Sequence, residues 1–139
     1  MARSVLSVIL GMVVGMTVNM ALITLNSSVL YPMPEGTTFE DTEAFQAYLD
    51  TLPAPAFLVV MAAHLGQALV GGWVAARLSA KAPIRQALIV GALSMAGGIQ
   101  MLLTVSGPTW MWAEVPLYLV LAYLAGRSVG ARNAGEIAG

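Results

Sequence analysis

The chain has 139 residues, of which 58% are apolar and only 9% are charged, and its formal net charge is -1. Its mean hydropathy is +0.81, whereas about a quarter of the residues of a soluble domain are charged. This composition excludes a water-soluble monomer, and the charge balance offers no basic surface for nucleic acid. Because the chain has no cysteine, it has neither disulfides nor thiolate metal sites.

Charged residues of opposite sign occupy alternate ends of the apolar segments. All six basic residues flank one set of ends: Arg3, Arg77, Lys81, Arg85, Arg127 and Arg132. Six of the seven acids lie at the other set: Glu35, Glu40, Asp41, Glu43, Asp50 and Glu114. Basic flanks are retained in the cytoplasm. The pattern therefore predicts an all-α membrane protein that crosses the bilayer four times, with both termini cytoplasmic.

The first predicted span covers residues 5–26. Four spans of roughly 20 residues fit this chain length, so we expect a single transmembrane domain, a four-helix bundle. Lipid gives apolar helices little reason to associate, so small residues and interhelical hydrogen bonds must hold them together. The first span places such residues at four-residue steps: Ser7, Gly11, Gly15 and Asn19.

An external loop, residues 27–53, follows the first span. It opens with a turn-forming segment that ends at Pro34-Glu35-Gly36. Thr37, with Glu40 three residues later, fits a capping box that starts a helix. Apolar residues then recur at helical spacing, namely Phe45, Tyr48, Leu49 and Leu52. The pattern predicts a short amphipathic interfacial helix, which either rests on the bundle as a connector or covers an external opening as a lid.

The second predicted span, residues 54–76, starts after Pro53 and ends at Arg77. Helical spacing places His64 and Gln67 on one face, together with three small residues, Ala68, Gly71 and Ala75. Leu69 and Trp73 point the other way, toward lipid. Gly72 adds further small surface for packing against a neighbouring helix.

The third predicted span, residues 84–106, carries the small residues Gly91, Ser94 and Gly98 and, near its outer end, Gln100. These small residues give the helix a smooth face for close packing.

The fourth predicted span, residues 110–127, follows a turn at Gly107-Pro108. Trp110 and Trp112 stand where an aromatic belt is expected. Within the span, Glu114 and Tyr118 share one face. The tail, residues 133–139, is small and polar, and we expect it to be mobile.

The polar residues inside the spans are the candidates for chemistry. Helical rise places Asn19, His64, Gln100 and Glu114 in the outer half of the membrane, and Gln67 and Tyr118 share faces with two of them. Because ionisable groups in a bilayer are costly, each should face protein or water.

Two interpretations of His64 remain open. As a neutral imidazole it would hydrogen-bond across helices and hold the bundle together. Alternatively, His64 and Glu114 would exchange a proton in an outward-facing cavity. Glu114 also has a simpler interpretation, as an interfacial acid stabilised by a helix N-terminus. One histidine and one glutamate do not define a metal site, and no nucleophile with a base is visible, so we expect no metal, no cofactor and no enzyme activity.

Several segments together resemble a known group of proteins. They are Tyr31-Pro32-Met33-Pro34-Glu35-Gly36 through Leu52-Pro53, His64-Leu65-Gly66, and Gly71-Gly72-Trp73-Val74-Ala75-Ala76-Arg77. The chain resembles, over most of its length, a family of small bacterial four-helix membrane proteins of unassigned function. Members tend to carry His-Pro near the third-to-fourth turn, where this chain has Ser106-Gly107-Pro108, which weakens the case for an essential second histidine. The resemblance implies a location in the bacterial inner membrane and no activity, substrate or cofactor.

Two functions from different classes follow from these observations. The first is a membrane protein that acts through helix packing, as a homo-oligomer or as an accessory subunit of a larger membrane assembly. The alternative is a minimal carrier or channel for protons, ions or a small amphiphile that uses the polar residues. A packing subunit needs a dry core and an exposed seam of small residues, whereas a carrier needs a cavity that reaches the polar residues. The expected partners are the lipid bilayer and other membrane subunits, not nucleic acid.

Overall fold

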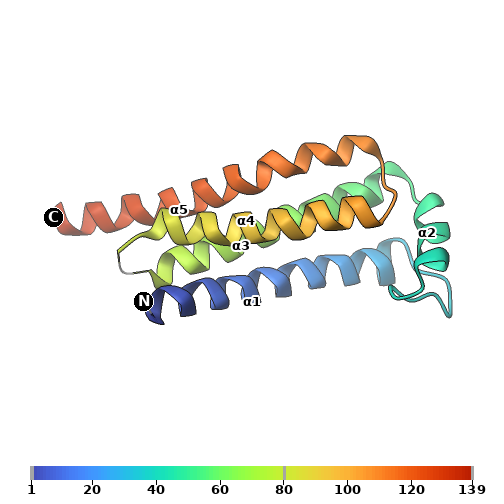
Figure 1. Cartoon of the computed structure of the whole chain (residues 1–139), viewed down its shortest axis with the longest axis horizontal. Coiled ribbons are helices and arrows are strands. Elements are labelled where there is room, and N and C mark those ends of the chain that lie inside the picture. The colour runs from blue at the N-terminus through green and yellow to red at the C-terminus, as the bar shows by residue number, and fades with distance from the viewer. Residues whose placement is uncertain (1, 80, 139) are drawn as a thin grey trace.

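Four long helices lie side by side in the computed structural model, and a short helix lies across one end (Figure 1). The structure describes the backbone of residues 2–79 and 81–138 and the side chains of residues 3–79 and 81–130. In chain order the helices are α1 (Ala2–Leu25), α2 (Thr42–Asp50), α3 (Ala54–Leu78), α4 (Pro83–Thr104) and α5 (Glu114–Ala138). The start of α1 and the end of α5 lie at the end of the bundle opposite to α2 (Figure 1).

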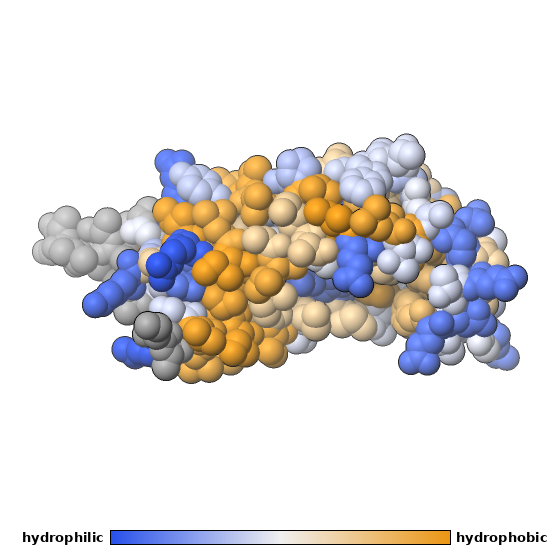
Figure 2. Space-filling model, in the orientation of Figure 1, coloured by the Kyte–Doolittle hydropathy of each residue, from blue (hydrophilic) through white to orange (hydrophobic). Residues whose placement is uncertain are grey.

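Three of the helices, α1 with the turn that follows it, α3 and α4, are long and apolar enough to cross a membrane. Many of their large apolar side chains point outward, among them Val5, Val13, Leu58, Leu93 and Leu103. On the face that Figure 2 shows, apolar residues predominate along the middle of the molecule and most hydrophilic residues gather toward both ends. Outward apolar surface of this extent is typical of a protein in contact with lipid or with another membrane protein. The three candidate spans indicate a multi-pass membrane protein.

The helix ends differ from the ends of the predicted spans. α1 continues into a π-helical turn, Asn26–Leu30, and a 3-10 turn, Thr109–Ala113, precedes α5. At its other end α5 extends to Ala138. Its backbone thus runs through most of the segment predicted as a mobile tail, residues 133–139, whose side chains lie outside the described residues.

The short helix predicted between the first two spans is present, but it begins later than the capping box predicted. Its N-cap is Asp41, whose carboxylate accepts a hydrogen bond from the amide of Ala44 at 3.1 Å. Thr37 does not cap a helix, because a turn with Gly36 at φ 83° precedes it and a further turn follows it. In that second turn the amide of Asp41 donates to Oγ1 of Thr38 at 3.3 Å. The chain therefore stays irregular until the carboxylate of Asp41 can satisfy the first free amides of α2.

α2 turns its apolar face toward the bundle. Phe45 and Tyr48 are buried, and the Tyr48 hydroxyl donates to the carbonyl of Tyr31 at 2.5 Å. On its other side, Gln46 bonds Ser106 in both directions. Its Nε2 donates to the Ser106 carbonyl at 3.0 Å, and its Oε1 accepts from the Ser106 amide at 2.9 Å. These bonds tie α2 to the connection between α4 and α5.

Glycines set the closest approach between α1 and α3. A Cβ on Gly11 would lie 2.5 Å from the carbonyl oxygen of Gly71, and a Cβ on Gly71 would lie 2.6 Å from that of Gly11. One turn further, a Cβ on Gly15 would lie 2.6 Å from the carbonyl oxygen of Gln67. α1 packs mainly along α3 and touches α4 much less, whereas α3, α4 and α5 all pack on one another. The bundle is therefore a three-helix unit with α1 docked onto one of its members.

Small residues also line the contact between α4 and α5. A Cβ on Gly91 would lie 2.5 Å from the Cβ of Ala122, and the ring of Tyr118 occupies the space where a Cβ on Gly98 would stand. Gly72 is less confined, since its nearest contact, with Ala122, is an ordinary 3.5 Å. The glycines singled out in the sequence thus lie at contacts inside the bundle, and the side chain of Tyr118 depends on one of them for room.

Candidate functional site

A cavity of about 520 Å³ lies between α1, α3 and α4, beneath α2. Methionine, aromatic and aliphatic side chains form most of its walls, among them Met16, Met20, Phe57, Val60, Met101 and Leu102. The apolar face of α2 covers it with Phe45, Tyr48 and Leu49, and Leu52, just after that helix, lies beside them. Figure 2 shows a hollow between α1 and α4, with hydrophilic atoms visible at its base. The cavity thus lies where α1 and α4 part.

Three side chains from three helices form a hydrogen-bonded chain at this cavity. Nδ2 of Asn19 donates to Oε1 of Gln67 at 2.7 Å, and Nε2 of Gln67 donates to Oγ of Ser94 at 3.2 Å. Gln67 and Ser94 are buried, and all three line the cavity. Within the described residues, neither the side-chain oxygen Oδ1 of Asn19 nor the hydroxyl proton of Ser94 has a hydrogen-bond partner. This series of hydrogen bonds therefore links α1 to α3 and α4, and it still offers one free acceptor and one free donor to a ligand.

A second polar group, on α3 and α5, consists of His64, Glu114 and Tyr118. Nδ1 of His64 lies 3.1 Å and 3.3 Å from the two carboxylate oxygens of Glu114, and the Tyr118 hydroxyl donates to Oε1 at 3.2 Å. Glu114 is 0% exposed, whereas the side chain of His64 is 12% exposed and lines the cavity. When Glu114 is ionised, Nδ1 must carry a proton to donate to it. His64 and Tyr118 both line the cavity and thus connect the buried carboxylate to it.

The position of Glu114 follows from the start of α5. It is the first residue of that helix, where free backbone amides favour a negative charge. Unlike a simple interfacial acid, its side chain does not reach the surface; it faces inward to His64 and Tyr118.

Five of the six predicted polar residues surround the cavity or contact a residue that lines it, and Gln100 does not. Gln100 is exposed on α4, and its backbone carbonyl accepts a hydrogen bond from Oγ1 of Thr104 at 2.8 Å. The cavity takes Gly98 and Met101 from that helix instead. Ser94, which the sequence assigned to small-residue packing, completes the hydrogen-bonded chain. The sequence did offer a signal for this role, because Ser94 lies four residues before Gly98 and therefore on the same face of α4.

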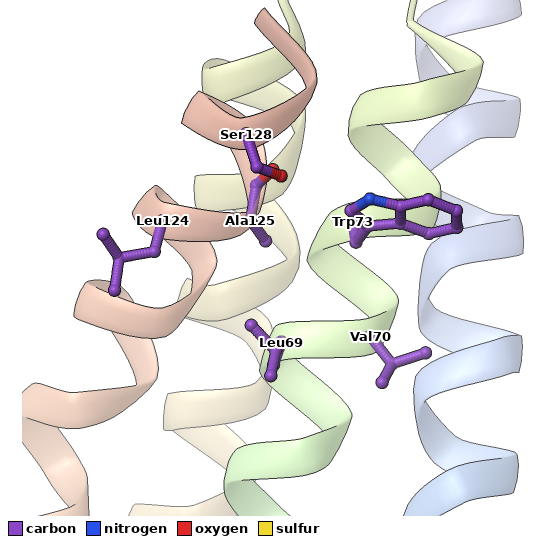
Figure 3. Close-up of a pocket in the computed structure, with 6 residues that line it drawn as sticks. All are labelled: Leu69, Val70, Trp73, Leu124, Ala125 and Ser128. Carbon is purple, nitrogen blue, oxygen red and sulfur yellow. The ribbon is translucent and has the colours of Figure 1, made fainter. Parts of the chain in front are cut away.

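A shallower hollow of about 290 Å³ lies on the outside of α3 and α5 (Figure 3). Its lining is Leu69, Val70 and Trp73 from α3 and Leu124, Ala125 and Ser128 from α5. The Ser128 hydroxyl donates to the carbonyl of Ala125 at 2.8 Å, so it is already satisfied within its own helix. The hollow shares no residue with the cavity, and its apolar lining suits lipid tails.

Comparison with protein-family models, with curated proteins and with solved structures gives no match to this chain. Within the described residues, no three His, Asp or Glu side chains lie close enough together to hold a metal ion. The cavity and its polar residues therefore provide the basis for a functional conclusion.

Proposed function

We propose that this protein is a four-pass protein of the bacterial inner membrane, with cytoplasmic termini, and that it binds and carries a small amphiphilic molecule. The observation that carries the proposal is the cavity of about 520 Å³, whose apolar walls surround amide, hydroxyl and imidazole groups. Each Å² of apolar ligand surface that is buried against such walls stabilises the complex by roughly 25 cal/mol. A few convergent polar groups orient the ligand. An amphiphile has an apolar part that suits the walls and a polar part that suits these groups.

The charge distribution supports the four-pass topology. α5 packs along α3 and α4, and like α3 it starts at the α2 end of the bundle (Figure 1). Arg77 and Arg127, near the other end, are both exposed. The acids of the loop and of α2 lie at the α2 end, so basic flanks mark the opposite end as cytoplasmic. The bacterial inner membrane is the location that the resemblance of the sequence implies.

The arrangement of α1 suggests how a ligand enters. Because α1 packs mainly on α3, a molecule dissolved in the bilayer can reach the cavity between α1 and α4 without passing through water. On the other side, α2 separates the cavity from the aqueous phase. The paired bonds of Gln46 with Ser106 hold this helix closed. α2 thus acts as the lid, and the parting of α1 and α4 is the lateral entrance.

One observation favours the second candidate function, assembly with another membrane protein or with a second copy. Gln100 is exposed on α4, and Ala92 and Ala96 precede it at four-residue steps on the same exposed face. An amide on a smooth helix face would hydrogen-bond a neighbouring helix. In contrast, Gly11, Gly15 and Gly71 are already in contact within the chain and cannot form the exposed seam that this function requires.

Photolabelling tests the proposed function. A long-chain alcohol that carries a diazirine would be added to liposomes that contain the protein, and the labelled peptides identified by mass spectrometry. We expect labels on cavity residues of α1 and α4, such as Met20 and Met101. Gly97 lines the cavity, and a Cβ there meets nothing within 4 Å. Gly97→Phe should therefore place a ring in the cavity from a position where its Cβ is unobstructed, and abolish these labels.

The matched control is Leu93→Phe, which places the same ring on the exposed face of α4. It should leave labelling of the cavity intact. Equal labelling of cavity residues in Gly97→Phe and in the unchanged protein would contradict the proposed function.

A further inference from the structure

The titratable groups near the cavity are few, and within the described residues none of them is a lysine or an arginine. α3 contributes His64, α5 contributes Glu114 and Tyr118, and α2 contributes Tyr48. Burial raises the pKa of Tyr48, so this phenol stays neutral. From α1 and α4, the polar groups that face the cavity are uncharged amides and hydroxyls. The charge of the site therefore depends on His64 and Glu114.

The pair of His64 and Glu114 is neutral only while it holds one titratable proton. The proton makes it either an imidazolium with a carboxylate or an imidazole with a carboxylic acid. If the proton leaves, one negative charge remains on a carboxylate that is 0% exposed. A buried charge without a partner is costly. A second positive charge beside the carboxylate would take over the role of the proton as the partner of this buried charge.

Other features of the cavity favour a positive charge. Aromatic rings line its α2 side, where Phe39 and Phe45 meet edge to face with centroids 5.1 Å apart, next to Tyr48. Ring faces attract cations. The loop and α2 add five acids and no basic residue between positions 27 and 53, which raises the concentration of cations at this end of the molecule.

We infer that the ligand is a lipophilic organic cation, such as an amine or quaternary ammonium with apolar groups, and that it binds in exchange for one proton. The inference rests on the proposed function and names its ligand class. The proton leaves the pair of His64 and Glu114 for water, and the ligand brings one positive charge to the cavity. The net charge of the occupied site therefore equals that of the protonated empty site, and no covalent bond changes.

The experiment compares two competitors of the photoreactive alcohol in liposomes: decyltrimethylammonium and its uncharged carbon isostere. We expect the cation to compete at least tenfold better than the isostere. While the pair is protonated, exchange for one proton makes the half-inhibiting concentration of the cation fall about tenfold per unit rise in pH. The isostere should show no such dependence. A dye in weakly buffered solution should report about one proton released per bound cation.

Glu114→Gln removes the titratable carboxyl and keeps its shape. Proton release and the pH dependence should disappear, and competition by the cation should weaken at least tenfold, while the isostere competes as before. The matched control is Glu43→Gln on the exposed surface of α2, which should retain both effects.

Equal competition by the cation and the isostere in the unchanged protein, or binding of the cation without proton release, would overturn this inference and needs no variant that might misfold. In that outcome, cavity labelling by the alcohol would still support the proposed function. Absence of cavity labelling would instead reject the proposed function itself.

Discussion

At the scale of single residues, Asn26 is the polar side chain least well accommodated. It is buried at the junction of α1 and the π-helical turn, and its Nδ2 donates to the carbonyl of Ala56 at 3.3 Å. No described residue donates to its Oδ1. Turning the amide over would place two acceptors against each other at Ala56, so the orientation is fixed. A buried acceptor without a donor costs roughly 1–3 kcal/mol.

We therefore expect Asn26→Leu to stabilise the protein by about 1 kcal/mol, the unpaired acceptor outweighing the one amide bond that is lost. Thermal unfolding in detergent measures the change. Asn26→Asp is the control, because it keeps the size but places a charge in the same buried position, and it should lower the melting temperature. A clear loss of stability in Asn26→Leu would mean that the bond to Ala56 is worth more than the unpaired oxygen costs.

A second residue-scale prediction concerns the contact of α1 with α3. Gly11→Ala would place a methyl group 2.5 Å from the carbonyl oxygen of Gly71, a backbone atom that cannot rotate away. Overpacking of this kind typically costs 1–3 kcal/mol, so the melting temperature should fall. Gly97→Ala makes the same chemical change in α4, where a Cβ has open space. If both variants melt alike, α1 does not rely on this close approach.

At the scale of elements, α2 is an amphipathic helix fastened by a single side chain on its outer side. Besides its two bonds with Ser106, Gln46 donates to Oδ1 of Asp50 at 2.9 Å. The remaining hold on α2 comes from apolar contact and the bond of Tyr48 to Tyr31. Because α2 has so few directional bonds, its local opening costs less free energy than opening of the long helices.

Gln46→Leu should therefore increase hydrogen exchange in α2 by severalfold while leaving α3 and α4 unchanged. Exchange followed by mass spectrometry reads each segment separately. Gln100→Leu is the control, since it makes the same change at an exposed glutamine whose side chain has no hydrogen-bond partner among the described residues. Unaltered exchange in α2 would show that apolar contact alone holds this helix in place.

Comparison of elements also shows what the sequence can predict. The long helices and the amphipathic face of α2 follow from hydropathy and spacing, which are local. The start of α2 does not, because Thr37 and Asp41 are both good caps and the turn at Gly36 decides between them. The sequence could have predicted that Gln100 faces away from the cavity, because residues two positions apart, such as Gly98 and Gln100, face opposite sides of a helix.

The cavity itself could not be predicted from the sequence. Helical spacing tells which residues share a face, and it brought His64 and Gln67 together on one face of α3 and Glu114 and Tyr118 on one face of α5. It does not tell how far apart two facing helices stand. That separation depends on the docking of α1 onto α3 rather than onto α4, which is a property of the whole packing arrangement.

At the scale of the whole molecule, the separation of charge predicts which residues face each side of the membrane. Thr42→Cys and Thr109→Cys, at two exposed positions of the α2 end, should react in intact cells with a thiol reagent that does not cross membranes. Lys81→Cys, exposed in the connection between α3 and α4, should react only after the membrane is permeabilised. Reaction of Lys81→Cys in intact cells would contradict the four-pass topology with cytoplasmic termini.

The attachment of α1 mainly to α3 has a consequence for how the chain is made. Asn19 precedes its hydrogen-bond partner Gln67 by 48 residues. At a synthesis rate of about 5–20 residues per second, Asn19 leaves the ribosome roughly 2–10 s before that partner. During this interval α1 is alone in the bilayer, with an unpaired amide and an uncovered glycine face. Among the described long helices, α1 thus has the longest interval before its main partner follows, and we expect the insertion machinery to cover its glycine face during that interval.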